Sequence, residues 1–480
     1  MEPERSLSQS PRLSRKDEIR RKAVEYGIVA LLIWTPLPLG SVHEWSILVI
    51  EIAALVLFGL TLMMDRPPQR NPKLAARLKW PRYALTGFLA FLVLQIVPLP
   101  AFLVRIFSPQ AAALRDAYVP SAAPAVTTLS LLPGRTLASG LEIAAYLMIG
   151  AVIVKTATHR RQFRRIVATL VAMGTFEAFY GLFEMLRRNP RLLLYKKELM
   201  LDSATGTFFN RNHFSGYLEM ILPLAVGLIL SRLDLLSGAP VKWRDRLARL
   251  AAKGAALNVL TGVGLVVMAI AILRSNSRSG AVILAVIFLL FFGMTAWQFA
   301  KARLRPGLAF KVLRISLLAI LALSLYVGVD KMIGRFSLDR LLQDGRPQYW
   351  GKTMRMIGDF PLTGVGLGAY GQVYQAYDVM GMEYALVHAH NDYLEYLTEL
   401  GIVGFVLLAG TVFFLFGDSI RTWAKRRHPE VKGLALGGIV SVLALFLHSL
   451  TDFNLRIPAN ALVLTVVLSL TFAVSYHRKT

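Results

Sequence analysis

Residues 256–300 read ALNVLTGVGLVVMAIAIL, RSNSRS and GAVILAVIFLLFFGMTAWQFA, two long apolar runs on either side of a short polar turn. A helix needs about 20 predominantly apolar residues to cross the hydrocarbon core of a bilayer, and each run supplies roughly that length. The stretch therefore predicts two transmembrane helices joined by a tight turn that contains arginine and serine.

The same alternation of apolar runs and short charged stretches continues along the chain of 480 residues. Apolar residues make up 55% of it and charged residues only 17%, whereas soluble domains are about a quarter charged. The mean hydropathy is +0.52. These values exclude soluble, fibrous, disordered and disulfide-stapled classes, and predict an all-α polytopic membrane protein with about 12 transmembrane helices. The predicted spans are 23–40, 46–64, 83–100, 137–154, 166–186, 214–231, 256–273, 280–300, 312–329, 393–417, 433–450 and 459–476.

The formal net charge of +25 is explained first by membrane orientation. Membrane proteins concentrate Lys and Arg in cytoplasmic loops, and here these residues fill alternate loops, such as 65–82, 155–165 and 232–255. Both termini are therefore expected in the cytoplasm, and nucleic-acid binding is set aside. The first span lacks a clear signal-peptidase site, so it is expected to be retained as a helix.

This pattern divides the chain into five parts. They are a cytoplasmic basic tail, about five N-terminal helices, the central helices, a long external loop with short helices and site residues, and about three C-terminal helices. Their predicted boundaries are 1–22, 23–200, 201–329, 330–392 and 393–480.

Two external loops carry many cations against the orientation rule. Residues 187–212 include Arg211, and residues 330–392 include Arg346, while Arg278 lies in the short turn between two spans. External cations near a bilayer favour an anionic partner, and arginine suits phosphate because its planar fork donates two parallel hydrogen bonds. A single such arginine often pairs only with lipid headgroups, but here the pattern recurs in three loops.

The long external loop and the start of the next span are also rich in tyrosine. Seven of the sixteen tyrosines lie between Tyr349 and Tyr396. Tyrosine has an apolar face and a polar tip, which suits both a membrane-interface belt and stacking on sugar rings. With the cations, the stretch is interpreted as a site for a partner that is part carbohydrate and part phosphate.

Two motifs in this region have alternative explanations. Gly366–Gly371 fits G-x-G-x-x-G, but the flanking strand and helix of a dinucleotide fold are missing, so the glycines are expected to form a tight turn. The run from His388 through His390 to Asp392 resembles an H-x-H-x-D metal site. However, Tyr393 stands where a further histidine is usual, and the chain has no cysteine. We therefore expect neither a metal nor a cofactor.

The most specific motif begins at the external end of a predicted span. It is His390-Asn391, then nine residues, then Gly401-x-x-Gly404. This stretch resembles the signature H-[NSQ]-x9-G-x-x-G of the O-antigen ligase and O-antigen polymerase superfamily, which comprises bacterial envelope glycosyltransferases.

Other segments add to the resemblance. Ser277–Gly280, Gly345–Trp350, Phe360–Gly366 and Gly206–Phe214 are similar to family segments, and the family also has about twelve spans with one long periplasmic loop near the C-terminus. The resemblance covers about residues 200–420; upstream of these only the helical pattern agrees.

The resemblance implies transfer of a glycan from an undecaprenyl diphosphate carrier to a hydroxyl on the periplasmic face of the inner membrane. The acceptor is lipid A–core in a ligase and a lipid-linked repeat unit in a polymerase, and the sequence leaves both open. His390 matches the position of a general base, and Arg278 and Arg346 match diphosphate-binding arginines. The chemistry agrees, because histidine titrates near neutral pH and a diphosphate leaving group needs mainly charge neutralisation. Direct displacement would invert the anomeric centre.

Further polar residues at the external ends of spans are secondary candidates for contacts with the carrier or the sugar. Each has an equally good local explanation, as a partner for backbone groups or neighbouring charges. They are Arg211, Asn212, His213, Tyr349, Asn391, His448, Asp452, Asn454 and Arg456. Glu395 and Glu399, four residues apart on one helix face, are expected either to orient the base or to make polar contacts between helices.

The partners expected for a glycosyltransferase are its donor, its acceptor and membrane lipids. Two other functional classes stay open. A transporter of lipid-linked glycans also has about twelve spans and internal termini, but related halves and mid-span polar sites are expected there. A catalytically silent partner of a polysaccharide export system is the second alternative.

Overall fold

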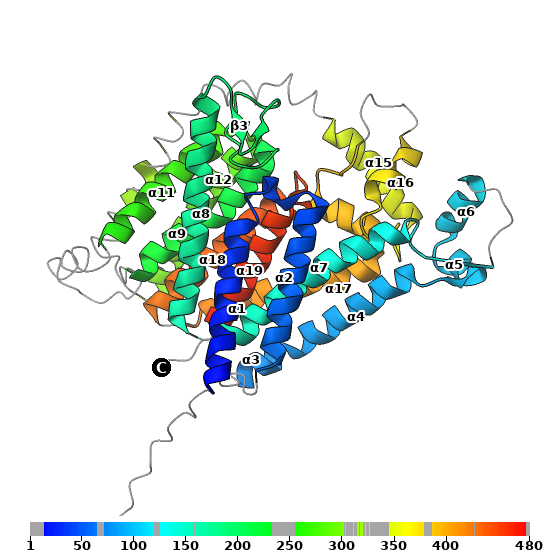
Figure 1. Ribbon diagram of the computed structural model, residues 1–480, viewed down its shortest axis with the longest axis horizontal. Coiled ribbons are helices and arrows are strands. Elements are labelled where there is room, and N and C mark those ends of the chain that lie inside the picture. The colour runs from blue at the N-terminus through cyan, green and yellow to red at the C-terminus, as the bar shows by residue number, and fades with distance from the viewer. Residues whose placement is uncertain are drawn as a thin grey trace, which may run out of the picture.

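The protein is built almost entirely of helices packed side by side (Figure 1). The computed structural model describes residues 14–64, 72–118, 125–157, 159–232, 255–301, 345–378, 386–426 and 428–476, with scattered positions between 303 and 326. The predicted all-α fold of a polytopic membrane protein is confirmed.

Nine helices in the described ranges are long and apolar enough to cross a membrane. They correspond to nine of the predicted spans. They are α2 (Glu44–Leu62), α7 (Pro133–Thr156), α8 (Arg160–Leu186), α9 (Arg211–Arg232), α11 (Ala255–Arg274), α12 (Arg278–Lys301), α17 (Asp392–Trp423), α18 (Pro429–His448) and α19 (Pro458–Ser475).

Three predicted spans are not among these nine. The spans at 23–40 and 83–100 correspond to α1 (Arg15–Trp34) and α4 (Lys79–Ile96), whose charged first turns lower their hydropathy. The span at 312–329 lies largely outside the described residues. The total of twelve therefore stays a prediction.

The bounds of α1 differ from the prediction because helix caps and prolines, not hydropathy, end a helix. Ser14 accepts a hydrogen bond from the backbone N–H of Asp17 at 3.1 Å, so the helix begins at Arg15, inside the expected basic tail. It ends at Trp34, just before Pro36, because proline cannot donate the next helical hydrogen bond.

Short elements connect the long helices. Two-residue strands pair as β1 with β2, where Leu99 faces Thr127, and as β3 with β4, where Arg191 faces Lys196. The remaining short elements are η1 (Leu39–Ser41), α3 (Pro72–Arg77), β1 (Leu99–Pro100), α5 (Ala101–Phe107), α6 (Pro109–Tyr118), β2 (Val126–Thr127), β3 (Arg191–Leu192), β4 (Tyr195–Lys196), α15 (Arg346–Asp359), α16 (Tyr370–Tyr374), η2 (Gln375–Tyr377) and η3 (Asn454–Arg456).

Helix α9 forms the centre of the bundle, and its apolar segment is buried over its whole length. It packs closely against α18 because glycines face each other. A Cβ on Gly227 would lie 2.7 Å from the carbonyl oxygen of Gly433 and 2.9 Å from Cα of Gly437. Small residues let membrane helices approach until their backbones touch, which is the main source of attraction between helices in lipid.

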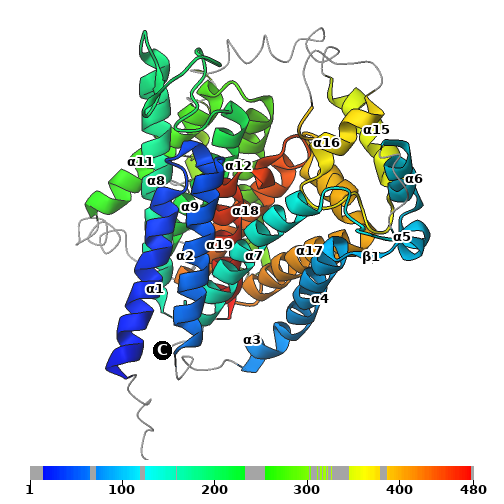
Figure 2. The same ribbon diagram turned by 45° about the vertical axis from the view of Figure 1, so that its right-hand side comes forward.

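The loops expected in the cytoplasm meet at one end of the bundle. Arg165 pairs with Glu25 at 2.5 Å and Arg160 pairs with Glu430 at 3.3 Å, so these loops are joined by ion pairs. The start of α1 and the end of α19 lie at this same end in Figure 1. The start of α17 lies at the opposite end, near α15 and α16 (Figure 2).

Helix α17 is interrupted in its N-terminal part. Gly401 has φ 58° and ψ −175°, a conformation that glycine alone adopts readily. The interruption frees the backbone carbonyls of Thr398 and Glu399. They accept hydrogen bonds from the N–H groups of Val365 and Gly366, each at 3.0 Å.

The segment Phe360–Gly366 therefore replaces the missing helical partners. In return, the N–H of Ile402 donates to the carbonyl of Pro361 at 2.8 Å. Gln95 of α4, fully buried, donates to the carbonyl of Thr363 at 2.7 Å. Irregular backbone is tolerated at membrane depth only where protein satisfies its polar groups, and this segment does so.

These contacts explain both glycine motifs of the sequence. Gly366 and Gly368 have φ of 107° and 77°, so the G-x-G-x-x-G stretch forms the expected tight turn. Gly404, the last residue of G-x-x-G, packs against Phe91, whose ring carbon would lie 2.6 Å from a Cβ at this position. The motif thus serves the helix interruption and the packing beside it.

Replacing Gly401 with alanine is expected to destabilise the protein strongly. The backbone strain costs about 1–3 kcal/mol, and a Cβ would also collide with the carbonyl of Leu362. The melting temperature in detergent measures the loss. Gly417→Ala, in open space in the same helix, is the matched control and should melt like the wild type. Equal melting temperatures for both variants would contradict the described interruption.

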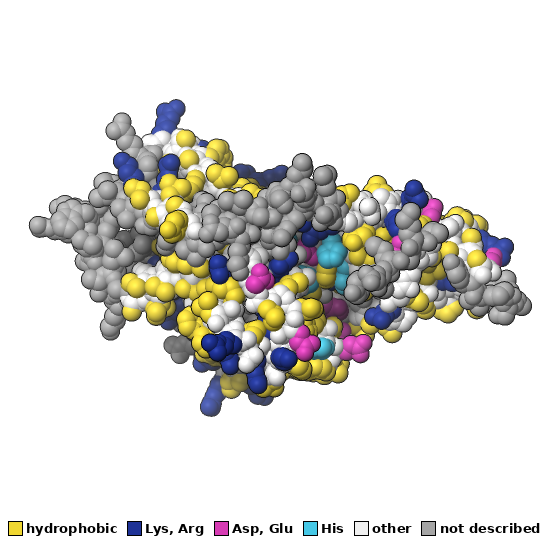
Figure 3. Space-filling model, turned by 90° about the horizontal axis from the view of Figure 1, so that it is seen from above, with side chains coloured by type: hydrophobic (Ala, Val, Ile, Leu, Met, Phe, Trp, Pro, Cys, Tyr) yellow, Lys and Arg dark blue, Asp and Glu magenta, His cyan; other side chains and the backbone are white. Residues whose placement is uncertain are grey.

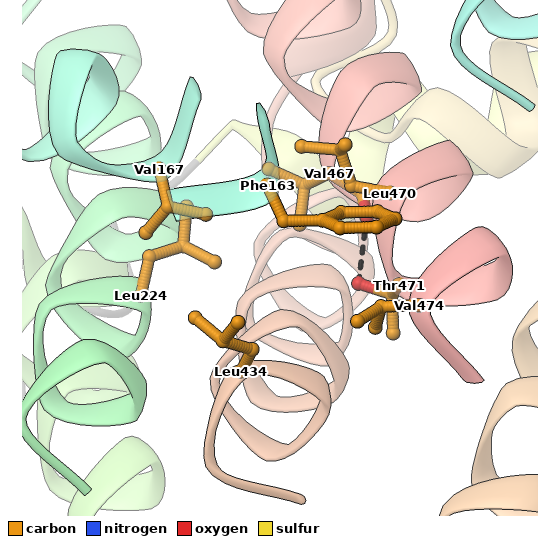
Figure 4. A pocket seen from close by; sticks show the side chains of 8 residues that line it. All are labelled: Phe163, Val167, Leu224, Leu434, Val467, Leu470, Thr471 and Val474. Atoms are coloured by element: carbon orange, nitrogen blue, oxygen red, sulfur yellow. Dashed lines mark hydrogen bonds between the residues drawn. The ribbon is translucent and has the colours of Figure 1, made fainter. Parts of the chain in front are cut away.

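A cavity of about 20 Å³ lies between α8, α9, α18 and α19 (Figure 4). Its lining is apolar apart from Thr471, whose hydroxyl already donates to the carbonyl of Val467 at 2.6 Å. The space is too small and too apolar for a sugar or a phosphate, and we treat it as a packing void. The other lining residues are Phe163, Val167, Leu224, Leu434, Leu470 and Val474.

Candidate active site

The segment before α17 holds His390 at the end of the bundle opposite the loops that are expected in the cytoplasm. His390 has a positive φ of 48°, so the chain turns sharply before the helix begins. Asn391 is the N-cap, and its side-chain oxygen accepts the N–H of Leu394 at 3.1 Å. The same side chain donates to the carbonyl of Leu450 at 3.0 Å. The secondary candidate Asn391 therefore fixes the position of His390 relative to the turn between α18 and α19.

A buried carboxylate lies beside His390. Nδ1 of His390 is 3.3 Å from Oδ1 of Asp452, and the His390 side chain is 29% exposed whereas that of Asp452 is fully buried. Asn212 donates to Oδ2 of Asp452 at 2.5 Å, and Nε2 of His213 lies 3.7 Å from Oδ1. The structure thus brings three sequence candidates, His390, Asn212 and His213, to one carboxylate.

The charge of Asp452 follows from its surroundings. Burial alone would raise its pKa, but the neighbouring rings of His213 and His390 hold the pKa well below its usual range. Asp452 is therefore a carboxylate at neutral pH. A carboxylate at Nδ1 of an imidazole favours the tautomer in which Nε2 is free to accept a proton.

The positive charge of Arg456 is balanced by two buried carboxylates. Its Nε lies 2.9 Å from Glu395, it also pairs with Glu399, and its guanidinium lies 4.2 Å from the ring centre of Tyr396. Burial would lower the pKa of Arg456, but the charges of Glu399, Tyr396 and Glu395 raise it well above the usual value. Glu395 and Glu399 were expected either to orient the base or to make polar contacts between helices. The structure shows polar contacts with Arg456, and the carboxylate beside His390 is that of Asp452.

Arg278 begins α12 at the edge of the site. The hydroxyl of the next residue, Ser279, lies 2.8 Å from that of Thr451, which directly precedes Asp452. Arg278 and the partly buried Arg211 are close enough for their charges to interact. Two of the predicted phosphate-binding candidates thus lie together on one side of the site.

Arg346 begins α15, which lies over the start of α17. One turn further along this helix, the indole of Trp350 donates to the carbonyl of Ala389 at 3.0 Å. The charge of Arg346 also acts on His448. Tyr349, on the same helix, is half-buried. The arginine and tyrosine candidates of the long loop are thus tied to the segment that carries His390.

His448 does not face a substrate. Its Nδ1 lies 2.9 Å from Oε2 of Glu219, and neither side chain has any exposed surface. The pair links α18 to α9 below the site. The expectation that His448 contacts the carrier or the sugar is therefore not supported by its position, and we assign it to packing between helices.

The residues of the H-x-H-x-D motif diverge. His388 pairs with Glu395 at 2.9 Å and His390 with Asp452, while Asp392 accepts from Ser449 at 2.7 Å and from the N–H of Leu455 at 3.1 Å. Within the described ranges, no three His, Cys, Asp or Glu side chains are grouped as metal ligands. The absence of a metal in the mechanism remains a prediction.

Sequence reasoning found most of these residues but not their partners. Asp452 was one of several polar residues at an external turn, and its place beside His390 follows only from the docking of α18 and α19. A useful signal was present, since an acidic residue between two apolar runs on the external side must lie near the other external loops. Glu219 also gave a signal that was not used, because a carboxylate inside a predicted span is rare and calls for a polar partner.

The site-bearing end of the molecule displays histidine side chains between acidic and basic ones (Figure 3). Residues 263–409 match a family model described as O-antigen ligase. Over 343 residues the chain is 23% identical to the exopolysaccharide production protein ExoQ of Rhizobium meliloti (strain 1021), a match that covers 68% of this chain and 69% of that protein. On a helical membrane fold, these two matches support the resemblance to the O-antigen ligase and polymerase superfamily and a role in polysaccharide biosynthesis.

Proposed function

We propose that this protein is a glycosyltransferase that moves a glycan from an undecaprenyl diphosphate carrier to a hydroxyl acceptor. The observation that carries the proposal is the pair formed by His390 and Asp452 at the end of a membrane bundle. The family match and the similarity to ExoQ support polysaccharides as the substrate class.

His390 acts as the general base in this proposal. Asp452 holds the imidazole through Nδ1, so Nε2 accepts the proton of the acceptor hydroxyl as the oxygen attacks the anomeric carbon. Asn212 fixes Asp452 from the other side through its second oxygen. One direct displacement of this kind inverts the anomeric configuration.

Arg278 and Arg346 neutralise the diphosphate as it leaves. The bond between the anomeric carbon and the phosphate oxygen breaks, and its electron pair remains on the diphosphate. Arginine suits this group because it donates two parallel hydrogen bonds and keeps its charge at every physiological pH. Arg211 adds positive charge beside Arg278, and Tyr349 provides a ring face for a sugar next to Arg346.

The proposed orientation places this chemistry on the periplasmic face of the inner membrane. Basic loops gather at the end opposite the site, as the preference of Lys and Arg for the cytoplasm predicts. Both termini are then cytoplasmic, and the long loop 330–392 is periplasmic. A lipid-linked donor reaches such a site from the outer leaflet.

Transfer by the purified protein in liposomes tests the proposal. We expect a larger glycan product together with free undecaprenyl diphosphate. Translocation of intact donor without any product would instead identify a transporter. Glycans of a deletion strain separate the two acceptors: long chains left on the carrier indicate a ligase, and single repeat units indicate a polymerase.

Transfer activity should persist in excess EDTA. The diphosphate charge is neutralised by arginine in the proposed mechanism, and His388 and His390 are each paired with a different carboxylate rather than aimed at one ion. Initial rates with and without the chelator, measured with the same donor, check this. Loss of activity that zinc or magnesium restores would contradict the proposed mechanism.

A further inference from the structure

A second pair of a histidine and a carboxylate lies beside the first. Nδ1 of His388 is 2.9 Å from Oε1 of Glu395, which is buried. The side chains of His388 and His390 are equally exposed, at 29% each. The ring of Phe453 contacts both of them, with centroid distances of 4.2 Å to His388 and 4.9 Å to His390. Both imidazoles are therefore partly exposed and lie against the same aromatic ring.

Two buried carboxylates and one guanidinium lie beside His388. Glu395 and Glu399 are both buried, and Arg456 is the only guanidinium that pairs with them in the described part of the chain. Buried charges are costly unless they are balanced, so two carboxylates facing one guanidinium call for a second cation. His388, in hydrogen-bond contact with Glu395, is placed to supply it.

We infer that His388 is a binding residue for the diphosphate of the lipid carrier, which it contacts as an imidazolium through Nε2. The inference rests on the proposed function. Nδ1 is used by Glu395, and Nε2 lies on the other edge of the ring. A charge-assisted hydrogen bond from this edge to a phosphate oxygen would complement the arginine candidates.

The two histidines then have opposite tasks in one step. Neutral His390 takes the proton from the acceptor hydroxyl, the new bond forms from that oxygen to the anomeric carbon, and the bond from carbon to diphosphate breaks. Protonated His388 keeps its proton and donates a hydrogen bond to the oxygen that receives the electron pair. The two histidines have different carboxylate partners. Asp452, beside His390, also contacts His213 and Asn212, whereas Glu395, beside His388, also pairs with Arg456.

Two amide substitutions separate binding from structural support. In His388→Asn the amide nitrogen replaces Nδ1 and keeps the contact with Glu395, whereas in His388→Gln it replaces Nε2 and keeps the donor toward the ligand. The probe is undecaprenyl diphosphate without a sugar, titrated into purified protein in detergent. We expect affinity to fall about tenfold in His388→Asn and about threefold or less in His388→Gln, because one charge-assisted contact is lost or only weakened.

His390→Ala is the matched control, since a base acts on the acceptor and its loss should leave the affinity for this probe unchanged. Wild-type affinity in a His388→Asn protein with an unchanged melting temperature would overturn the inference and leave the proposed function standing. Equal losses in both His388 variants, accompanied by lower melting temperatures, would assign His388 to holding Glu395 and overturn it too. A wild-type protein that does not bind the probe would contradict the proposed function itself.

Discussion

His390→Ala is expected to lower the rate of glycan transfer by about 10²–10⁴-fold, the usual contribution of a positioned general base. The protein should fold normally, because His390 is partly exposed and the helix cap is made by Asn391. The measurement is the initial rate of transfer in liposomes at saturating donor and acceptor. Turnover like that of the wild type would remove His390 from the mechanism.

Asp452→Asn provides the companion variant. The amide keeps the shape of the side chain but removes the charge that orients His390, so we expect a smaller loss, about tenfold or more. Combined with His390→Ala it should add almost nothing, since residues that act as a unit are not additive. A further loss in the double variant would show that Asp452 acts independently of His390.

Arg278→Lys and Arg346→Lys should each slow transfer by roughly ten- to a hundredfold at limiting donor. Lysine keeps the charge but presents a compact donor, so it attracts a diphosphate without holding two of its oxygens in one plane. One charge-assisted contact contributes about 1.5–3 kcal/mol, which gives this range of rates. The acceptor concentration that gives half-maximal rate should not change.

Arg187→Lys is the matched control, because Arg187 already pairs with Glu184 at 2.8 Å and lies on the exposed segment after α8. It should transfer glycans like the wild type. Normal rates in both site variants would make Arg278 and Arg346 ordinary interface cations. The diphosphate would then have to be sought at Arg188, Arg191 or Arg211.

The sequence predicted the features that depend on composition alone. Within the described ranges, apolar length located nine helices that can cross a membrane, because this length is set by the bilayer and not by neighbouring residues. The orientation expected from the basic loops stays a prediction. Helix α1 begins at Arg15, before the predicted span at 23–40, because the Ser14 cap starts the helix among polar residues.

The candidate site was predictable only in part. The motif located His390 and Asn391, but the partner of His390 lies 62 residues further along the chain, where local patterns carry no information. The interruption at Gly401 was equally hidden. An apolar run with four glycines resembles any membrane helix until a second segment, here Phe360–Gly366, is seen to occupy the gap.

The order in which the chain is synthesised gives the interrupted helix a further consequence. Gln95 and the segment Phe360–Gly366 both precede Gly401, so the groups that satisfy the free carbonyls of Thr398 and Glu399 have already left the ribosome when this helix enters the bilayer. Asp452 follows later, between α18 and α19. The scaffold around His390 is therefore able to assemble early, whereas His390 acquires its carboxylate only when α18 and the turn after it have followed.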